Sequence, residues 1–198
     1  MFPFEDLITD PRRVEALLDG SYICGEAGTL DYWEFRRRPL VKAFGGPGSL
    51  LDIGCANGFL LRCLVEWSAH KLEPYGIDVD ENLLAQSSQL FPDLQSHFAL
   101  LPMGHLEKRG KAGLPDKFDY VYWNVWDDFE FGAEAFAGWL GKARDAVKKG
   151  GRLILGFYNE DLADSKAKLK WLAQNFKEPE ALIDNAPHPE LFAYWTLV

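Results

Sequence analysis

The chain has 198 residues, 47% of them hydrophobic and 26% charged, a composition ordinary for a single globular domain with its own core. Its formal net charge of -9 and its pI of about 4.9 would repel phosphate backbones, which argues against free DNA or RNA as a substrate. No apolar run reaches the length of a membrane span and the first residues are too polar for a signal peptide, which favours a cytoplasmic protein without a membrane partner.

Residues 1–44 precede the first predicted core strand, and we expect them to form a helical cover. Asp10 is a typical helix cap, and the apolar residues after it predict a helix over residues 11–18. A second helix is predicted over residues 30–44, where Pro39 must kink or divide it. The aromatic and basic side chains of this segment either pack on the core or reach a ligand, and both interpretations stay open at this stage.

The stretch SLLDIGCANGFLL at residues 49–61 is the most informative part of the chain. Its apolar start predicts a short buried strand that ends near Asp52, and residues 54–58 predict a glycine turn. Apolar residues then recur at helical spacing, which predicts a helix over residues 57–70. Glycines in such a turn let a ligand lie against bare backbone, and two of the positions are expected to need a positive φ.

The spacing of these glycines differs from that of the dinucleotide-binding motif G-x-G-x-x-G. If Gly54 were its first glycine, the next two would fall on Ala56 and Phe59. A phenylalanine at the third position would keep the helix from packing closely on the strand. An oxidoreductase that binds a nicotinamide dinucleotide is therefore not favoured.

The rest of the chain alternates between strands and helices, which predicts an α/β fold with a doubly wound, mostly parallel sheet. Beyond the turn, strands are expected at residues 74–78, 96–101, 118–125 and 152–158, and helices at residues 81–90, 133–148 and 161–176. A poorly defined helix is expected within residues 102–117. Lys149-Gly150-Gly151 is expected to close the predicted helix at residues 133–148. The tail, residues 181–198, predicts an antiparallel hairpin on the sheet edge.

A second acid follows the glycine turn at the spacing that an adenine cofactor requires. Asp78 ends the apolar run of residues 75–78, about 20 residues after the turn, where a carboxylate reaches ribose hydroxyls. Its two acceptor oxygens match two vicinal hydroxyl donors. Asp80, two residues later, is interpreted as the cap of the next helix.

The pattern D-x-G-x-x-x-G from Asp52 to Gly58, followed by Asp78, resembles the first two motifs of class I S-adenosylmethionine-dependent methyltransferases. FDYVYWNVW and KKGGRLILGFY are similar to the fourth and fifth strands of that family, so the resemblance covers residues 49–158. It implies one methyltransferase domain over residues 1–198, with a Rossmann-like core from residue 45 under the helical cover. It also implies S-adenosyl-L-methionine as the cofactor.

The resemblance further implies which residues contact that cofactor. Asp52 would lie near its ammonium group and Asp78 at its ribose, and Leu101 would contact adenine because the third strand ends without the acid that is common there. Tyr22 and Arg37 are among the residues of the cover that could reach its carboxylate. The other residues assigned to the cofactor site are Gly54, Cys55, Gly58, Val79 and Asn124. Cys55 is interpreted as a small space-filler in the turn, and the three cysteines lack metal-ligand spacing, so no metal is expected.

Methyl transfer from a sulfonium is an in-line displacement in which the protein supplies position and electrostatic field. The topology points the methyl toward the carboxyl end of the predicted strand 118–125, near Asn124. Beyond it, Trp126 could stack on a planar acceptor, and Asp127 or Asp128 could orient or deprotonate it. Equally, Trp123 and Trp126 could belong to the core while the aspartates cap the next helix. His105 is a weaker candidate base.

We therefore interpret the sequence as that of a methyltransferase with a small-molecule acceptor. The strand end has no Asn-Pro-Pro-aromatic sequence, which argues against methylation of an exocyclic base amine. Two basic clusters, at residues 36–38 and 166–170, are interpreted as solvated faces or helix ends rather than nucleic-acid grooves. The alternative is a methyltransferase-like domain that binds the cofactor or a protein partner without catalysis.

Overall fold

The computed structural model describes residues 3–21, 29–125, 132–157, 162–184 and 190–198. Its strands are β1 (Gly48–Ile53), β2 (Leu72–Asp78), β3 (Phe98–Leu100), β4 (Phe118–Asn124), β5 (Val147–Phe157), β6 (Ala181–Asp184) and β7 (Leu191–Thr196). Its α-helices are α1 (Phe4–Ile8), α2 (Pro11–Asp19), α3 (Leu30–Arg37), α4 (Phe59–Trp67), α5 (Glu81–Leu90), α6 (Glu134–Asp145) and α7 (Leu162–Asn175). Three 3-10 segments complete this set: η1 (Arg38–Ala43), η2 (Gln95–His97) and η3 (Met103–Ala112).

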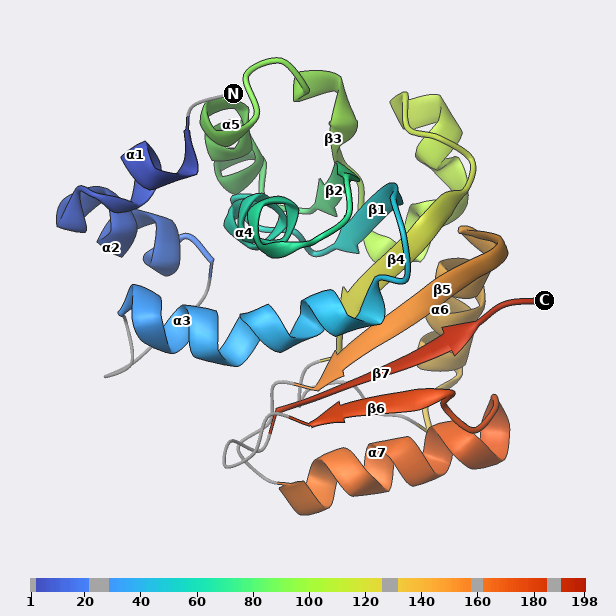
Figure 1. The fold of residues 1–198 in the computed structure, drawn as a ribbon. Helices are drawn as coiled ribbons and strands as arrows, with labels where there is room; N and C mark the ends of the chain where they lie inside the picture. The colour runs from blue at the N-terminus through green and yellow to red at the C-terminus, as the bar shows by residue number, and fades with distance from the viewer. Residues whose placement is uncertain (1–2, 22–28, 126–131, 158–161, 185–189) are drawn as a thin grey trace.

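The strands form one sheet in the order β3-β2-β1-β4-β5-β7-β6 (Figure 1). Strands β1 to β5 are parallel, and β7 runs antiparallel between β5 and β6. The predicted parallel sheet and the predicted C-terminal hairpin are both confirmed. Within that hairpin β7 is an inner strand, and β6 forms one edge of the sheet, opposite the edge formed by β3.

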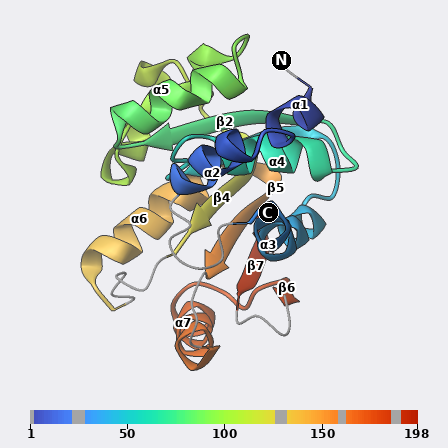
Figure 2. The ribbon, with the colours of Figure 1, turned by 90° about the vertical axis from the view of Figure 1, so that its left-hand side faces the viewer.

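Each face of the sheet carries its own hydrophobic cluster, as a doubly wound sheet requires. One cluster joins α6, α7 and η3 to the sheet and includes Trp123, Phe136 and Leu172. The other joins the helices from α1 to α5 to the opposite face and includes Leu18 and Phe59. The N-terminal helices α1 and α2 lie beside α4 and α5 (Figures 1 and 2).

Capping groups set the limits of several helices as predicted. Asp10 Oδ1 accepts a hydrogen bond from the Arg12 N–H at 3.0 Å, and α2 follows. Asp80 Oδ1 accepts the N–H groups of the first turn of α5 in the same way. Pro39 divides the next predicted helix, as expected. The α-helix α3 ends at Arg37, and the chain goes on as the 3-10 segment η1.

The predicted end of α6 and start of β5 were wrong. Lys149-Gly150-Gly151 does not close α6, which ends at Asp145, but lies inside β5. The reason is a pairing with the far end of the chain: Gly150 N–H donates to the Leu197 carbonyl at 2.6 Å, and Leu197 N–H donates to the Gly151 carbonyl at 2.9 Å. Two smaller corrections concern α4, which is shorter than predicted at both ends, and β3, whose predicted start is taken by η2.

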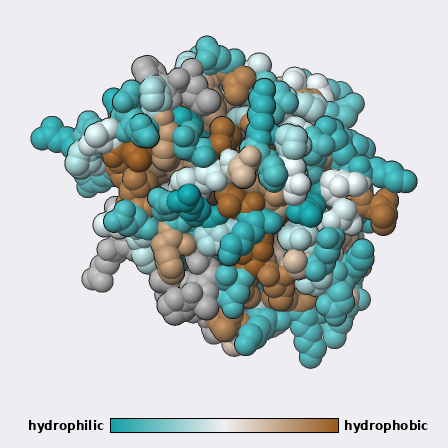
Figure 3. Space-filling model, viewed as in Figure 1, coloured by the Kyte–Doolittle hydropathy of each residue, from teal (hydrophilic) through white to brown (hydrophobic). Residues whose placement is uncertain are grey.

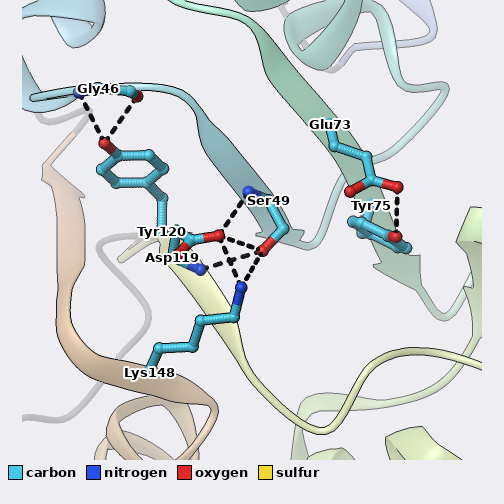
Figure 4. A network of polar contacts seen from close by, with 7 residues as sticks. All are labelled: Gly46, Ser49, Glu73, Tyr75, Asp119, Tyr120 and Lys148. Carbon is cyan, nitrogen blue, oxygen red and sulfur yellow. Dashed lines mark hydrogen bonds and ion pairs between the residues drawn. The ribbon is translucent and has the colours of Figure 1, made fainter.

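A polar network joins the amino ends of β1 and β4 (Figure 4). Asp119 Oδ2 accepts hydrogen bonds from the Ser49 N–H, the Ser49 hydroxyl and the Lys148 ammonium, each at 2.8 Å. Burial opposes ionisation of Asp119, but the Lys148 and Ser49 donors outweigh it and hold the pKa of this carboxyl below its usual range. The Tyr120 hydroxyl donates to the Gly46 carbonyl at 2.9 Å. These contacts fix the register of β1 on β4, and hence which residues meet at the carboxyl ends.

Hydrophilic side chains predominate on the face shown in Figure 3, with hydrophobic groups exposed between them. Across the described parts of the chain, no helix combines the length and the apolar character needed to span a bilayer.

Candidate functional site

The turn after β1 lies against the end of β2. Gly54 N–H and Cys55 N–H both donate to the Ile77 carbonyl, at 2.8 and 3.0 Å. Asp52 precedes this turn and Asp78 follows Ile77, so the turn brings together the two acids that the sequence singled out. In parallel sheets with helices on both faces, ligands bind at this edge, outside the carboxyl ends of the strands.

Two positions of the turn need glycine, as predicted. Gly54 has φ +79° and Gly58 has φ +77°, which is the left-handed region that favours glycine. A Cβ added at Gly58 would also lie 3.1 Å from the Cβ of Ser87 in α5. Ala56 has φ +49°, uncommon for a residue with a side chain, and its N–H donates to Asp78 Oδ2 at 2.7 Å. Asp78 therefore holds the turn in shape.

The Asp78 carboxylate is held by backbone groups on both of its oxygens. Oδ1 accepts the N–H groups of Val79 at 2.7 Å and Asp80 at 3.0 Å, while Oδ2 accepts, from the described residues, the N–H of Ala56 alone. A carboxylate oxygen has two lone pairs, so Oδ2 retains the capacity to accept a further donor. The sequence predicted a ligand-binding role for Asp78 but not this second role in building the turn.

Asp52 is a buried carboxyl group, only 3% exposed, near the end of β1. Burial raises the pKa of Asp52, and the charge of Asp78 raises it further, to about 8. The group is therefore mostly protonated at neutral pH in the unliganded protein. A cation placed beside it would favour the ionised form and so gain a charged partner.

Asn124 ends β4 at the same edge of the sheet. Its side-chain Oδ1 is buried and accepts no hydrogen bond from the residues that the structure describes. A buried acceptor without a partner costs roughly 1–3 kcal/mol, so a ligand that supplies a donor here would be favoured. Trp126, Asp127 and Asp128, where we predicted contacts with the acceptor, lie outside the described residues, and their roles stay predictions.

Trp123, one of the two tryptophans considered as walls of an acceptor site, belongs to the core. It is 3% exposed and stacks on Phe136 of α6, with ring centroids 5.6 Å apart. His105 in η3 is exposed, and its Nδ1 lies 3.6 Å from Glu107 Oε1. The role of His105 as a candidate base stays a prediction.

Three more residues assigned to the cofactor site lie near Asp78. Val79 is 70% exposed, while Leu101 is buried and its N–H donates to the Asp78 carbonyl at 3.0 Å. Leu100, which sequence reasoning missed, pairs with Asp78 in the register of β3 on β2 and is exposed. Cys55 is buried, and a Cβ added at Gly76 would lie 2.5 Å from its Sγ. Its thiol therefore fills space over a glycine of β2.

The cover is attached through a buried carboxylate to the carboxyl end of the parallel strands, where Leu191 of β7 pairs with Phe157, the last residue of β5. Glu190, just before β7, is fully buried and forms ion pairs with Arg36 and Arg37 of α3. Sequence reasoning gave Glu190 no role, and Arg37 has an internal partner that the sequence did not predict. The proposed contact of Arg37 with a cofactor carboxylate stays a prediction, as does that of Tyr22, which lies outside the described residues. Among the described side chains, no group of three or more His, Cys, Asp or Glu could hold a metal ion.

No protein-family model matches this sequence, and no curated protein matches it either. Solved structures are similar to its fold. An S-adenosylmethionine-dependent methyltransferase from Aquifex aeolicus has a TM-score of 0.60 at 16% identity, over 96% of this chain and 99% of that one. Human methyltransferase-like protein 13 in complex with S-adenosylhomocysteine has a TM-score of 0.54 at 20% identity, over 84% of this chain and 78% of that one.

An rRNA methylase from Streptococcus thermophilus has a TM-score of 0.54 at 16% identity, over 82% of this chain and 94% of that one. At these identities the likeness concerns the fold. This chain has the Rossmann-like fold of class I S-adenosylmethionine-dependent methyltransferases.

Proposed function

We propose that this protein is an S-adenosylmethionine-dependent methyltransferase that acts on a small-molecule acceptor. The observation that carries the cofactor assignment is the pair of buried acids beside the glycine turn. Asp78 is fixed at the end of β2, where Oδ2 can accept a ribose hydroxyl. Asp52 is a buried carboxyl whose pKa is raised in the free protein, and an ammonium group of the cofactor placed beside it would lower that pKa.

The apolar residues at this edge suit the adenine ring. Val79 and Leu100 expose their side chains next to Asp78, and Leu101 is buried beneath them in the core. Such surfaces favour a flat aromatic ring by apolar contact, in place of the acid that this chain lacks at the end of β3.

The cofactor, when bound, supplies an electrophilic methyl group. The chain's own residues need only place the acceptor in line with it, which can contribute about 7–11 kcal/mol. Asn124 Oδ1 is buried and has no partner within the described parts of the chain, so it is suited to accept a hydrogen bond from the N–H or O–H group of the acceptor. Asp127 and Asp128, which follow in sequence, are proposed to orient or deprotonate that group.

Charge supports a small-molecule acceptor over a nucleic acid. Net charge is -9. All three arginines of the first basic cluster and one lysine of the second have carboxylate partners. Arg36 and Arg37 pair with Glu190, Arg38 pairs with Glu34, and Lys168 pairs with Asp164. The fold alone does not distinguish a small-molecule acceptor from RNA, because an rRNA methylase has a similar fold. We favour a neutral or cationic acceptor with an aromatic or amine-bearing part, held by stacking and by a carboxylate.

Binding of S-adenosylmethionine is expected to be micromolar and to strengthen with pH by up to about tenfold per unit between about pH 5.5 and 7. The reason is that Asp52, with a pKa of about 8 in the free protein, must release its proton to face the cofactor's ammonium. That ammonium stays charged in this range, because an α-amino group titrates near pH 8. Calorimetry in two buffers of different ionisation enthalpy measures both the affinity and the proton release.

Asp52→Asn is the matched control for this titration. It is expected to bind the cofactor more weakly, without proton release and with a flat pH dependence. The raised pKa of Asp52 also affects stability. Because folding raises this pKa, the free energy of unfolding of the unliganded protein should decrease as pH rises from about 4 to 8. A wild-type affinity equal at pH 5.5 and 7 would contradict the role of Asp52. Tighter binding of NAD than of S-adenosylmethionine would contradict the cofactor assignment.

The acceptor assignment predicts where a methyl group goes. With S-adenosylmethionine labelled on the methyl carbon and a cell extract as the source of acceptors, we expect label in the small-molecule fraction. Asp127→Asn or Asp128→Asn is expected to lower this turnover at unchanged cofactor affinity, while Asp145→Asn, an exposed carboxyl at the end of α6, is the neutral control. Label found in bulk RNA would refute the small-molecule assignment, and binding without any transfer would favour the non-catalytic alternative.

A further inference from the structure

Asn57 is a fully buried residue of the glycine turn whose side chain leaves the turn and reaches the cover. Its Nδ2 donates to the carbonyl of Leu17 in α2 at 2.9 Å. Its Oδ1 accepts the N–H of Phe59, the first residue of α4, at 3.1 Å, and lies 2.7 Å from the Ser21 hydroxyl. One amide therefore holds the start of α4, the end of α2 and Ser21, two positions beyond α2.

The end of α2 is shaped around this amide. Gly20 caps the helix in an ordinary helical conformation, with φ -68°, so its backbone does not require glycine. A Cβ at this position, however, would lie 2.6 Å from Asn57 Nδ2. Gly20 and Asn57, 37 positions apart in the sequence, are thus fitted to each other.

A pocket lies beside the end of α2 that Asn57 contacts. A cavity of about 710 Å³ separates α2 from α5, and Leu17, Gly20 and Leu83 are among the residues that line it. Side chains across such a gap forfeit part of their dispersion attraction. The hydrogen bonds of Asn57 therefore add a polar attachment to the apolar packing of Val14 and Leu18, through which α2 joins the core.

The same turn is held on its ligand side by Asp78, through the N–H of Ala56, the residue before Asn57. Adjacent residues of one short turn are thus fixed by the acid assigned to the ribose and by the cover. A shift of either would move the other, because Ala56 is already in a sparsely populated conformation and leaves the turn little freedom.

We propose that Asn57 is a positioning residue that couples the docking of α2 to the cofactor-binding shape of the glycine turn. This inference rests on the proposed function, in which the ligand of the turn is S-adenosylmethionine or its product. Coupling of this kind is reciprocal: the factor by which a ligand favours docking of α2 is the factor by which docking favours the ligand.

Trypsin cleavage of the full-length protein at Arg12 and Arg13, which are exposed on α2, reports undocking of that helix. S-adenosylhomocysteine is expected to slow this cleavage at least tenfold in the wild type. In Asn57→Ala the unliganded protein should be cut faster, and the protection should be lost even when calorimetry shows the site to be saturated. The dissociation constant should rise by the factor by which protection falls.

Gly20→Ala tests the same contact from the cover and leaves the turn residues untouched. Alanine is the better helix residue, so a purely local effect would slow cleavage, whereas the coupling predicts faster cleavage and weaker binding. In the Asn57→Ala background the same substitution is expected to become harmless, which a double-mutant cycle measures. Asn175→Ala is the control: it removes an exposed hydrogen bond from the side-chain amide to the Trp171 carbonyl, and it should change neither the cleavage rate nor the affinity.

The outcomes separate this inference from the proposed function. Full protection by S-adenosylhomocysteine in both Asn57→Ala and Gly20→Ala would overturn the coupling and leave the cofactor assignment intact. If the wild type bound no S-adenosylhomocysteine, the proposed function would fail. If Asn57→Ala and Gly20→Ala had additive effects on cleavage of the unliganded protein, the contact between Asn57 and Gly20 would be refuted. Should Asn57→Ala fail to fold by circular dichroism, Gly20→Ala alone decides, since it keeps every hydrogen-bonding group of the turn.

Discussion

Asp78→Ala is expected to weaken binding of S-adenosylhomocysteine by roughly 1.5–3 kcal/mol, or about 10- to 150-fold. The substitution removes a charged acceptor from the ribose hydroxyls. It also leaves the N–H groups of Ala56, Val79 and Asp80 without their acceptor, so the turn itself loosens. Calorimetry at pH 7 measures the loss, and thermal unfolding of the unliganded protein reports the damage to the turn.

Two controls separate these contributions. Asp80→Asn removes a charge two residues away but keeps a good helix cap for α5, so its affinity is expected to stay close to that of the wild type. Asp78→Asn retains one carbonyl oxygen and so keeps part of the turn, with a loss between those of the other two variants. An unchanged dissociation constant in Asp78→Ala would mean that the ribose is bound elsewhere.

The parts of the site that could be predicted from the sequence are those set by local chemistry. The glycines at 54 and 58 mark a turn because only glycine adopts a positive φ at no steric cost, and both residues have it. Asp10 and Asp80 mark helix starts because their carboxylates accept N–H groups two or three residues away. Such signals lie within a few residues of the feature that they predict.

The missed features depend on pairs of residues far apart in the chain. Gly150 looked like the end of a helix, but its N–H pairs with Leu197, and this pairing extends β5 backwards. The amide of Asn57 finds its acceptor 40 positions earlier, in α2. Glu190 lies 153 positions from Arg37. No periodicity or motif in one sequence indicates such a partner, because its position is fixed only once the sheet has formed.

The acceptor end of the site was the least predictable for a different reason. Trp123 and Trp126 lie three positions apart in an aromatic-rich stretch of the sequence, and such a stretch is compatible with a core or with a binding wall. Trp123 packs on Phe136 in the core. Asn124, next to it, was assigned from topology alone, and its unpaired Oδ1 is a property that no sequence pattern shows.

Glu190→Ala is expected to lower the free energy of unfolding by about 3–5 kcal/mol. The carboxylate is fully buried and pairs with two guanidinium groups, and its removal takes one charged partner from Arg36 and one from Arg37, whose side chain is 5% exposed. The loss should be large because both cations keep their desolvation penalty while each loses one ion pair. Urea unfolding at pH 7 measures it, with an unchanged m-value as evidence that the two states compared are the same.

The pair between Arg38 and Glu34 is the matched control, because it joins the same residue types across one turn of helix but is exposed. Glu34→Ala is expected to change the stability by about 0.5 kcal/mol or less. Equal losses in Glu34→Ala and Glu190→Ala would contradict the structural role of the buried pair. The double substitution of Arg37 and Glu190 by methionine should regain most of the stability, since apolar side chains of similar volume replace buried ion pairs well.

The same double variant decides between the two roles of Arg37. If Arg37 serves only to hold α3 against the start of β7, the affinity for S-adenosylhomocysteine should recover together with the stability. If its guanidinium also contacts the cofactor carboxylate, as the sequence predicted, stability should return while affinity stays low, because methionine offers no charge to that carboxylate. Measuring both quantities on Glu190→Ala and on the double variant therefore separates an internal ion pair from a binding residue.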